Sequence, residues 1–343
     1  MKANGKSTAP GSGLMRTDNQ GQSHLPVNDA SMPMNDQQKI ELAALCPVVR
    51  WDVNMASHST FRTGGVVEAM VEPGSGDELA ALLGWLHRQH LEWRVIGGGS
   101  NILVTNRYHY GVFIRLRGSA EDMAIVPPTV AETGKCCRVR VGAGCSLAAL
   151  VSWCGRNGLG GLEFMAGIPG SVGGAIRMNA GAFGHSIGEV LQRVQCVNDR
   201  GEFFEAERGE IVFSYRHTRL PEEPEARMLI TGGEFLLAPA DRQGVEARCR
   251  EIIAQRRQKQ PAGVGSAGSF FKNPAGDFAG RLIERAGLKG LTLGKAMVSP
   301  QHANFIVNTG GAEPEDIIGL MQEVRHKVQQ QSGVLLEPEV HIF

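Results

Sequence analysis

Gly158–Gly188 reads GLGGLEFMAGIPGSVGGAIRMNAGAFGHSIG and holds ten glycines in 31 residues. A second cluster, Gly97-Gly98-Gly99-Ser100-Asn101, follows Trp93–Ile96, which we predict to be a short buried strand. Glycine tolerates positive φ and lets backbone N–H groups approach a ligand closely, and successive N–H groups can form a nest that binds phosphate. Neither cluster matches GxGxxG or GxxxxGKS/T, so neither a Rossmann nor a P-loop site is indicated. Two such clusters favour a diphosphate-bearing cofactor held by backbone groups, and the alternative is tight turns without a ligand.

The composition excludes several classes of protein. The 343 residues carry 35 Lys and Arg against 35 Asp and Glu, so the formal net charge is zero and non-specific nucleic-acid binding is not expected. A hydrophobic content of 42% supports a real core, and the length suggests two or three domains. The seven cysteines form no CxxC pair and the ten histidines no HExxH, so we predict reduced thiols and no metal site. The N-terminal residues contain no apolar stretch long enough for a signal peptide, and no apolar run in the chain is long enough for a membrane helix, so we expect a cytoplasmic protein without membrane contact.

Hydrophobic periodicity divides the chain into three parts. Residues 1–36 are rich in Gly, Ser, Asn, Gln and Asp, so we predict a disordered tail. Residues 37–237 mix strands with helices near 38–45, 76–90 (with Asp77 placed to cap) and 146–156, the last of which Gly158 ends. After Pro239 a charged helix runs to Lys259, and further helices are predicted at 278–286 and from Pro314. We therefore predict an α+β cofactor domain over 37–237 and a smaller α/β domain over 238–343.

Six segments resemble sequence motifs of the UDP-N-acetylenolpyruvoylglucosamine reductase family, in the same order along the chain. Three resemble its flavin-binding signatures, Asn54–Gly65 (NMASHSTFRTGG), Val95–Val104 (VIGGGSNILV) and Gly161–Gly184 (GLEFMAGIPGSVGGAIRMNAGAFG), and three its catalytic motifs, Phe213–Arg216 (FSYR), Ala267–Pro274 (AGSFFKNP) and Leu336–Val340 (LEPEV). The resemblance implies a two-part FAD-binding domain of the vanillyl-alcohol-oxidase (PCMH) type, followed by a substrate-binding domain. It also implies the reduction of UDP-N-acetylglucosamine enolpyruvate to UDP-N-acetylmuramate in peptidoglycan synthesis, with NADPH as the reductant.

One branch of this family carries a substrate-covering loop that contains a tyrosine. This loop is inserted between the first and the second catalytic motif. In this chain Ser269 follows Arg216 after only 53 residues, and no tyrosine follows Tyr215. The chain therefore resembles the shorter branch that lacks the loop.

The resemblance also implies the catalytic residues. Hydride transfer from reduced flavin to the enolpyruvyl group leaves negative charge beside a carboxylate, which needs a cation and then a proton. Arg216 is suited to the first task because its guanidinium is always charged and can bind a carboxylate in a bidentate manner. Ser269 is implied to be the proton donor, with Lys272 as a neighbour that could stabilise its alkoxide. Glu339 could help only if it is protonated or orients a partner, so we predict a raised pKa or a water link there.

The remaining site residues are implied less directly. We predict that the substrate contacts Tyr215, Lys259, Lys272, Asn273 and His302, although a packing role competes for His302. We predict that FAD binds without a covalent bond to two glycine-rich backbone segments and to nearby side chains, namely Thr60, Arg62, Gly97, Gly98, Gly99, Ser100, Asn101, Gly167, Ile168, Pro169, Gly170, Ser171, Gly173, Gly174, Asn179 and Gly181. Because Glu339 lies close to Phe343, its placement depends on how the last residues pack.

Two other functions remain open at this stage. The first is a different FAD-dependent oxidase or dehydrogenase on the same cofactor fold, and the second is a non-catalytic sugar-nucleotide binder. We expect a monomer or a weak homo-oligomer whose partners are the substrate and NADPH.

Overall fold

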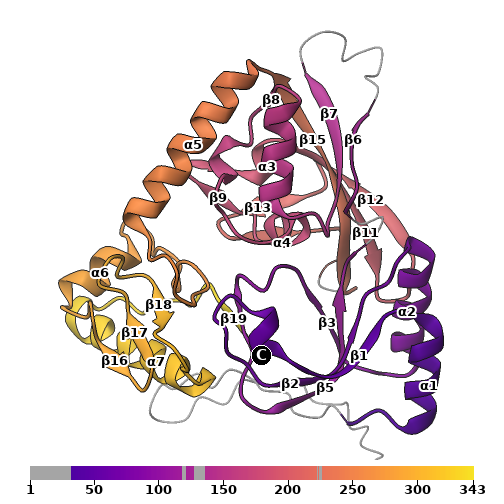
Figure 1. The fold of residues 1–343 in the computed structure, drawn as a ribbon, viewed down its shortest axis with the longest axis horizontal. Helices are drawn as coiled ribbons and strands as arrows, with labels where there is room; N and C mark the ends of the chain where they lie inside the picture. The colour runs from indigo at the N-terminus through magenta and orange to yellow at the C-terminus, as the bar shows by residue number, and fades with distance from the viewer. Residues whose placement is uncertain (1–31, 118–120, 127–135, 222, 224–225) are drawn as a thin grey trace, which may run out of the picture. The chain divides into compact units, whose positions relative to one another are not determined.

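The computed structural model describes residues 32–117, 121–126, 136–221, 223 and 226–343 (Figure 1). Most of the predicted tail, residues 1–31, lies outside this range. Within the described residues, packing against the first lobe already includes Met34, which is buried and whose N–H donates to Glu68 at 2.8 Å. The Asn35 side chain then caps the first helix.

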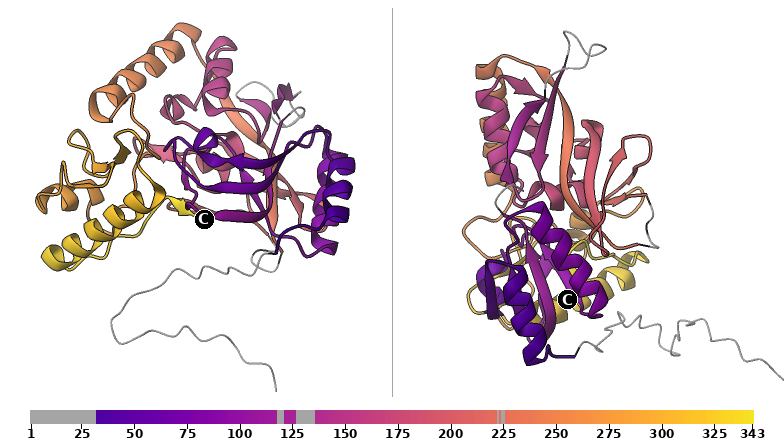
Figure 2. Two further views of the ribbon diagram at one scale, coloured as in Figure 1. Left: turned by 60° about the horizontal axis from the view of Figure 1, so that its bottom comes forward. Right: turned by 90° about the vertical axis from the view of Figure 1, so that its right-hand side faces the viewer.

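The first lobe is a four-stranded sheet, in the order β1-β2-β5-β3, covered on one face by two helices. Its elements are α1 (Asp36–Leu45), β1 (Val49–Asn54), the 3-10 turn η1 (Met55–His58), β2 (Val66–Val71), α2 (Gly76–Arg88), β3 (Trp93–Ile96), β4 (Ile102–Leu103) and β5 (Tyr108–Arg115). Figures 1 and 2 show α1 and α2 side by side against this sheet. Strand β2 is buried along nearly its whole length because Ala69 and Val71 face the helices while Val67 and Met70 face a second apolar cluster. A continuous apolar run is typical of a strand covered on both faces. The cap of α2 is Ser75, whose Oγ accepts from Glu78 N, and not the predicted Asp77.

The second lobe is built on a larger sheet in the order β12-β11-β15-β7-β6, with β8 also paired to β15. Its elements are β6 (Met123–Val126), β7 (Cys137–Gly142), α3 (Leu147–Arg156), β8 (Leu159–Gly160), η4 (Glu163–Met165), α4 (Val172–Arg177), β9 (Gly181–Ala182), β10 (His185–Ser186), η5 (Ile187–Glu189), β11 (Leu191–Asn198), β12 (Phe203–Glu207), β13 (Val212–Ser214), β14 (His217–Arg219), β15 (Met228–Pro239) and α5 (Arg242–Lys259). Helix α3 begins after the predicted cap Ser146 and ends before Gly158, whose φ is +63°. One hydrophobic core runs from α2 and β5 of the first lobe into β7, β11 and β15 of the second.

The third unit comprises α6 (Ala279–Arg285), β16 (Thr292–Leu293), β17 (Ala296–Val298), β18 (Ile306–Asn308), α7 (Pro314–Ser332) and β19 (His341–Ile342). Its own core contains the α7 residues Ile317, Met321, Val324 and Val328, as the helical periodicity predicts. Helix α5 packs instead on α3, η4 and β8, with Ile252 in the core of the first two lobes. In its packing, α5 therefore goes with the second lobe, although it follows the predicted boundary at 238.

The third unit is joined to the first lobe by backbone contacts that position the site. Strand β19 pairs in parallel with β4, and the His341 N–H donates to the Asn101 carbonyl at 3.0 Å. The Thr105 N–H donates to the Phe343 carbonyl at 2.9 Å, and the Phe343 ring packs edge-on against Phe113. Residues 339–343 are thus held against the glycine-rich loop that follows β3.

Candidate active site

The first side of the site is the loop Gly97–Asn101, which leaves β3 at its carboxyl end. Gly99 has φ +64°, and a Cβ at this position would overlap the carbonyl of His58. The Thr60 N–H and Oγ1 both donate to the Gly99 carbonyl, at 3.0 and 3.3 Å. Within the described residues, the N–H groups from Gly97 to Asn101 donate to no protein acceptor. Gly97 and Gly98 are exposed, and a row of unpaired backbone N–H groups that is open in this way is suited to an anionic ligand.

The second side is the segment Ile168–Gly174, which leads into α4. Gly98 lies against Gly170, since a Cβ on Gly98 would be 3.0 Å from the Gly170 Cα. The Ser100 Oγ donates to the Pro169 carbonyl at 3.0 Å, and the Ser171 side chain caps α4. The two glycine-rich clusters of the sequence therefore form one cradle, which we call the glycine cradle (97–101 and 168–174).

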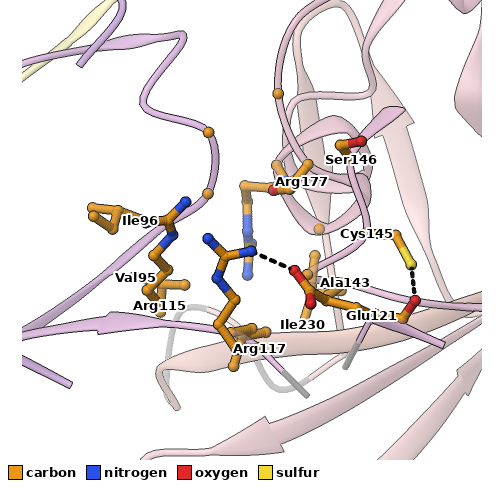
Figure 3. Close-up of a pocket in the computed structure, with 18 of the residues that line it drawn as sticks. Val95, Ile96, Arg115, Arg117, Glu121, Ala143, Cys145, Ser146, Arg177 and Ile230 are labelled. Atoms are coloured by element: carbon orange, nitrogen blue, oxygen red, sulfur yellow. Dashed lines mark hydrogen bonds and ion pairs between the residues drawn. The ribbon is translucent and has the colours of Figure 1, made fainter. Parts of the chain in front are cut away.

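The glycine cradle lies between two cavities. The first, about 510 Å³, is lined by residues of both lobes and contains the guanidinium groups of Arg115, Arg117 and Arg177 (Figure 3). In it, Arg117 pairs with Glu121 at 2.7 Å, and the Cys145 Sγ lies 2.7 Å from the Glu121 carbonyl oxygen. Burial raises the pKa of the Cys145 thiol to about 11, so this thiol stays protonated at neutral pH.

The second cavity, about 540 Å³, brings the three predicted catalytic residues together. Arg216, Ser269 and Glu339 line it with the glycine cradle, although they come from a hairpin, a loop and the segment before β19. Phe271 pairs with Pro338 in an isolated antiparallel bridge flanked by two backbone hydrogen bonds, which places Ser269 and Glu339 on neighbouring strands. The bridge tolerates Pro338 because neither flanking bond needs an N–H at that position. Within the described residues the Ser269 hydroxyl has no protein partner, so it is free to contact a ligand.

Arg216 sits at the tip of the β13–β14 hairpin with φ +57°, a region that non-glycine residues rarely adopt. Its Nη1 donates to the Gly181 carbonyl at 3.1 Å, and its Nε lies 2.8 Å from Oε1 of Glu339. The Nε–H is not aligned for a hydrogen bond to this oxygen, so the contact is an ion pair with a donor left over. Backbone strain of this kind is concentrated at functional sites.

Burial raises the pKa of the Glu339 carboxyl, while the nearby charges of Arg216 and Lys272 act in the opposite direction. The direction agrees with the sequence-based prediction for this residue. The Glu339 side chain is 13% exposed. A buried carboxyl beside cations can hold or release a proton with small changes in its surroundings.

The predicted substrate residues separate into two groups. The hydroxyl oxygen of Tyr215 accepts from the Asn273 N–H at 3.3 Å, Asn273 Oδ1 accepts from Ala279 N at 3.0 Å, and Lys272 Nζ lies 2.5 Å from Glu337. These three lie within four residues of Arg216 or Ser269 in the chain, but none of them is in the lining of the second cavity. Lys259 is exposed and outside the lining of the cavity. His302 is also outside the lining, where its Nδ1 accepts from Asn304 N and its ring packs on Phe305, so its contacts are those of a packed residue.

Most of the predicted cofactor contacts belong to the glycine cradle, and the others lie outside it. Gly181 lines the second cavity and Gly173 the first. Arg62 donates instead to the Gly263 carbonyl, and Asn179 bridges Ser214 and Gly188. Gly167 lines a third cavity, described below.

Arg256 and His341 are two of the lining residues that were not among the predicted site residues. Arg256, on α5, has a buried Nε without an acceptor, and both burial and the charge of Arg216 lower the pKa of its guanidinium. Its position four residues after the buried Ile252 could have indicated an inward orientation. His341 lies two residues after Glu339 and therefore on the same side of the extended chain. Its Nε2 is 3.3 Å from Met178 Sδ, and burial lowers the pKa of its imidazole.

Comparison with known proteins agrees with this arrangement. Residues 67–207 match the family described as an FAD binding domain, and residues 260–343 match the UDP-N-acetylenolpyruvoylglucosamine reductase, C-terminal domain. The UDP-N-acetylenolpyruvoylglucosamine reductase of Desulfosudis oleivorans is 42% identical over 301 residues, covering 86% of this chain and 94% of the relative. That of Syntrophus aciditrophicus is 39% identical over 294 residues, covering 86% and 91%. The crystal structure of the Thermus caldophilus reductase superimposes with a TM-score of 0.72 at 33% identity, over 86% of this chain and 100% of the other.

The first two lobes are therefore an FAD-binding domain of the vanillyl-alcohol-oxidase (PCMH) type, and the protein is a flavin-dependent oxidoreductase. The chain belongs to the UDP-N-acetylenolpyruvoylglucosamine reductase family, whose members act in peptidoglycan precursor synthesis with FAD and NADPH. The residues present fit FAD, because the cradle offers unpaired backbone N–H groups to a diphosphate and its glycines allow the two backbone segments to approach each other closely. These matches do not support a non-catalytic binder or an unrelated flavin oxidase. No helix of the described residues could cross a membrane, and none of their His, Cys, Asp and Glu side chains cluster for a metal ion.

Proposed function

We propose that the chain reduces UDP-N-acetylglucosamine enolpyruvate to UDP-N-acetylmuramate in the second cavity, with FAD held non-covalently. The observation that carries this proposal is the convergence of Arg216, Ser269 and Glu339 on one cavity beside the glycine cradle. When bound, FAD would be held by the glycine cradle and would supply the hydride chemistry between NADPH and the substrate. We also propose that the protein works in the cytoplasm.

Arg216 binds and stabilises the charge that develops on the substrate. Its guanidinium is fixed through the Gly181 carbonyl and Glu339, and its Nε–H remains unpaired and buried. Preorganised donors in a partly buried site are the usual way in which enzymes stabilise a developing oxyanion. Burial raises the pKa of Glu339, which favours the protonated form that can donate a hydrogen bond to the substrate carboxylate instead of repelling it.

Ser269 supplies the proton from its Oγ. The hydroxyl is a weak acid, so its conjugate alkoxide needs positive charge nearby, and Lys272 lies in the same loop with its ammonium paired to Glu337. Because the Glu337 side chain is 68% exposed, Lys272 can exchange this ion pair for a contact with the substrate when the substrate binds. Neither His58 nor the protonated Cys145 is arranged for covalent flavin attachment, since His58 is outside both cavity linings.

We assign the chain to the branch that lacks the tyrosine-bearing loop. Between Arg216 and Ser269 the chain forms β14, β15 and α5, and Tyr215 is its last tyrosine. Tyr215 itself lies at the rim of the site, 53% exposed, with its hydroxyl at Asn273.

The test is stopped-flow spectroscopy of Ser269→Ala. FAD reduction by NADPH should keep its wild-type rate, while reoxidation of the flavin by the enolpyruvyl substrate should slow by roughly 10²–10⁴-fold, the usual contribution of a general acid. Ser266→Ala is the matched control, because Ser266 is in the same loop but outside the cavity lining. Normal turnover by Ser269→Ala would show that another group donates the proton.

A further inference from the structure

A third cavity of about 660 Å³ is lined by residues of α3 and α5, by Ala166 and Gly167, and by the segment that follows α5. Its floor is apolar and includes Val151, Ala166 and Ile253. Its volume is in the range of small-ligand sites, which are mostly apolar with a few placed polar groups. Neither the glycine cradle nor the three catalytic residues line it.

The charged residues around this cavity are strongly biased towards arginine. Arg156 on α3 and Arg250, Arg256 and Arg257 on α5 line it, with Glu246 as the acidic residue of the lining. Among the described residues, the side chains of Arg156, Arg250 and Arg257 have no hydrogen bond or ion pair. An ordinary solvated helix face would show alternating charges in pairs.

Helix α5 itself provides that comparison. Its arginines that lie outside the cavity lining are paired along the helix, Arg242 with Glu246 at 2.9 Å and Arg248 with Glu251 at 2.6 Å. Glu246 is thus already engaged by Arg242 and does not neutralise the arginines of the cavity. The unpaired positive charge of α5 is concentrated where the helix borders the cavity.

Arg256 and Gln260 connect this cavity with the catalytic one, because both residues line both cavities. The Arg256 side chain also crosses the Phe183 ring, with the guanidinium carbon 5.5 Å from the ring centroid. Its Nε is buried without an acceptor. A ligand in the third cavity would therefore be one side chain away from the reacting groups.

We propose that the third cavity, which we call the arginine pocket, binds the phosphate-bearing part of a nucleotide. Phosphate oxygens match guanidinium groups in charge and geometry, and a base or ribose can pack on the apolar floor. The inference rests on the proposed function, since both reactants of that function are nucleotides. The phosphate is either that of the adenosine end of NADPH or the diphosphate of the sugar nucleotide.

Two single variants test the pocket from opposite walls, Arg156→Gln from α3 and Arg250→Gln from α5. Both side chains are exposed and unpaired, so the fold should be unaffected. Each variant should raise the KM of one nucleotide by roughly three- to tenfold, because a charged hydrogen bond contributes less at an exposed position than in a buried one. Each variant should also reduce the dependence of that KM on salt concentration. Arg248→Gln is the control, because it removes the same charge from the same helix outside the pocket.

The half-reactions distinguish the two sources of phosphate. A higher KM for NADPH in flavin reduction assigns the pocket to the reductant, and a higher KM for the enolpyruvyl substrate in flavin reoxidation assigns it to the sugar nucleotide. Unchanged KM values and salt dependence in both variants would overturn the inference. If the wild-type holoenzyme reduces no enolpyruvyl substrate, the proposed function fails, and calorimetric titration of the same variants with NADP⁺ and UDP still tests the pocket: weaker binding than in Arg248→Gln supports it, and equal binding overturns it.

Discussion

Replacing Arg216 by Lys tests whether the guanidinium, and not only its charge, is required. Arg216 reaches two groups at once, the Gly181 carbonyl at 3.1 Å and the Glu339 carboxylate at 2.8 Å. A lysine ammonium is a single centre that can retain one of these contacts but cannot span both and still present a free N–H to the substrate. Losing one charge-assisted hydrogen bond costs about 1.5–3 kcal/mol, which corresponds to roughly 10- to 150-fold in rate.

The loss should fall on one half-reaction. In stopped-flow measurements of Arg216→Lys, flavin reduction by NADPH should keep its rate, while reoxidation by the enolpyruvyl substrate slows by that factor. The φ of +57° costs Lys as much as Arg, so the melting temperature should change little. Arg219→Lys, on the exposed part of the same hairpin, is the control. Equal slowing of both half-reactions, or no slowing, would refute the role of Arg216 as a carboxylate-binding group.

Three further changes test the cradle, the carboxyl group and the end of the chain. Gly99→Ala should lose FAD on gel filtration and lower the melting temperature, because its Cβ would overlap the His58 carbonyl, whereas Gly184→Ala (φ +84°, open space) should retain the yellow cofactor. Glu339→Gln should become more stable relative to wild type as pH rises above about 4.5, since burial raises the pKa of Glu339 and its protonated form is lost in that direction; parallel stability curves in thermal denaturation would contradict this. Phe343→Ala should lower the melting temperature by a few degrees through loss of its aromatic contacts, and should slow flavin reoxidation more than flavin reduction.

Local signals in the sequence were sufficient to predict most helices. Helix α3 begins at the serine and ends at the glycine that the sequence indicates, because a cap and a left-handed residue act within one turn. The placement of α5 was not predictable in the same way. This helix is strongly polar and has only a narrow apolar stripe, so which lobe it joins depends on the surface that α3 and β8 offer to Ile252. The packing of α5 with the second lobe is therefore a result of tertiary contacts, and the domain boundary at 238 stays a prediction.

The composition of the candidate site was predicted better than its geometry. Arg216, Ser269 and Glu339 meet in one cavity because the β13–β14 hairpin and the Phe271–Pro338 bridge bring distant segments together. No periodicity in the sequence contains that information; the resemblance to a known family supplied it. On α5 the sequence analysis predicted Lys259 as a substrate contact. In the structure Arg256, about one turn earlier, lines the second cavity. Residues three apart are neighbours on one helix face, so which of the two side chains reaches the cavity is decided by the packing around the end of α5.

The net charge of zero conceals two different ways of holding anions. In the glycine cradle the donors are backbone N–H groups, and the nearby cations are neutralised, Arg117 by Glu121 and Arg177 by Glu223. Around the third cavity the donors are side chains whose charge is not matched by acidic neighbours, and Arg256, which also lines the second cavity, has a buried Nε without an acceptor. A resident cofactor is suited by the first arrangement, since it needs a fixed shape and little long-range attraction. Reactants that must arrive and leave are suited by the second, because unpaired guanidinium groups attract phosphates from a distance and release them as salt and competing ligands allow.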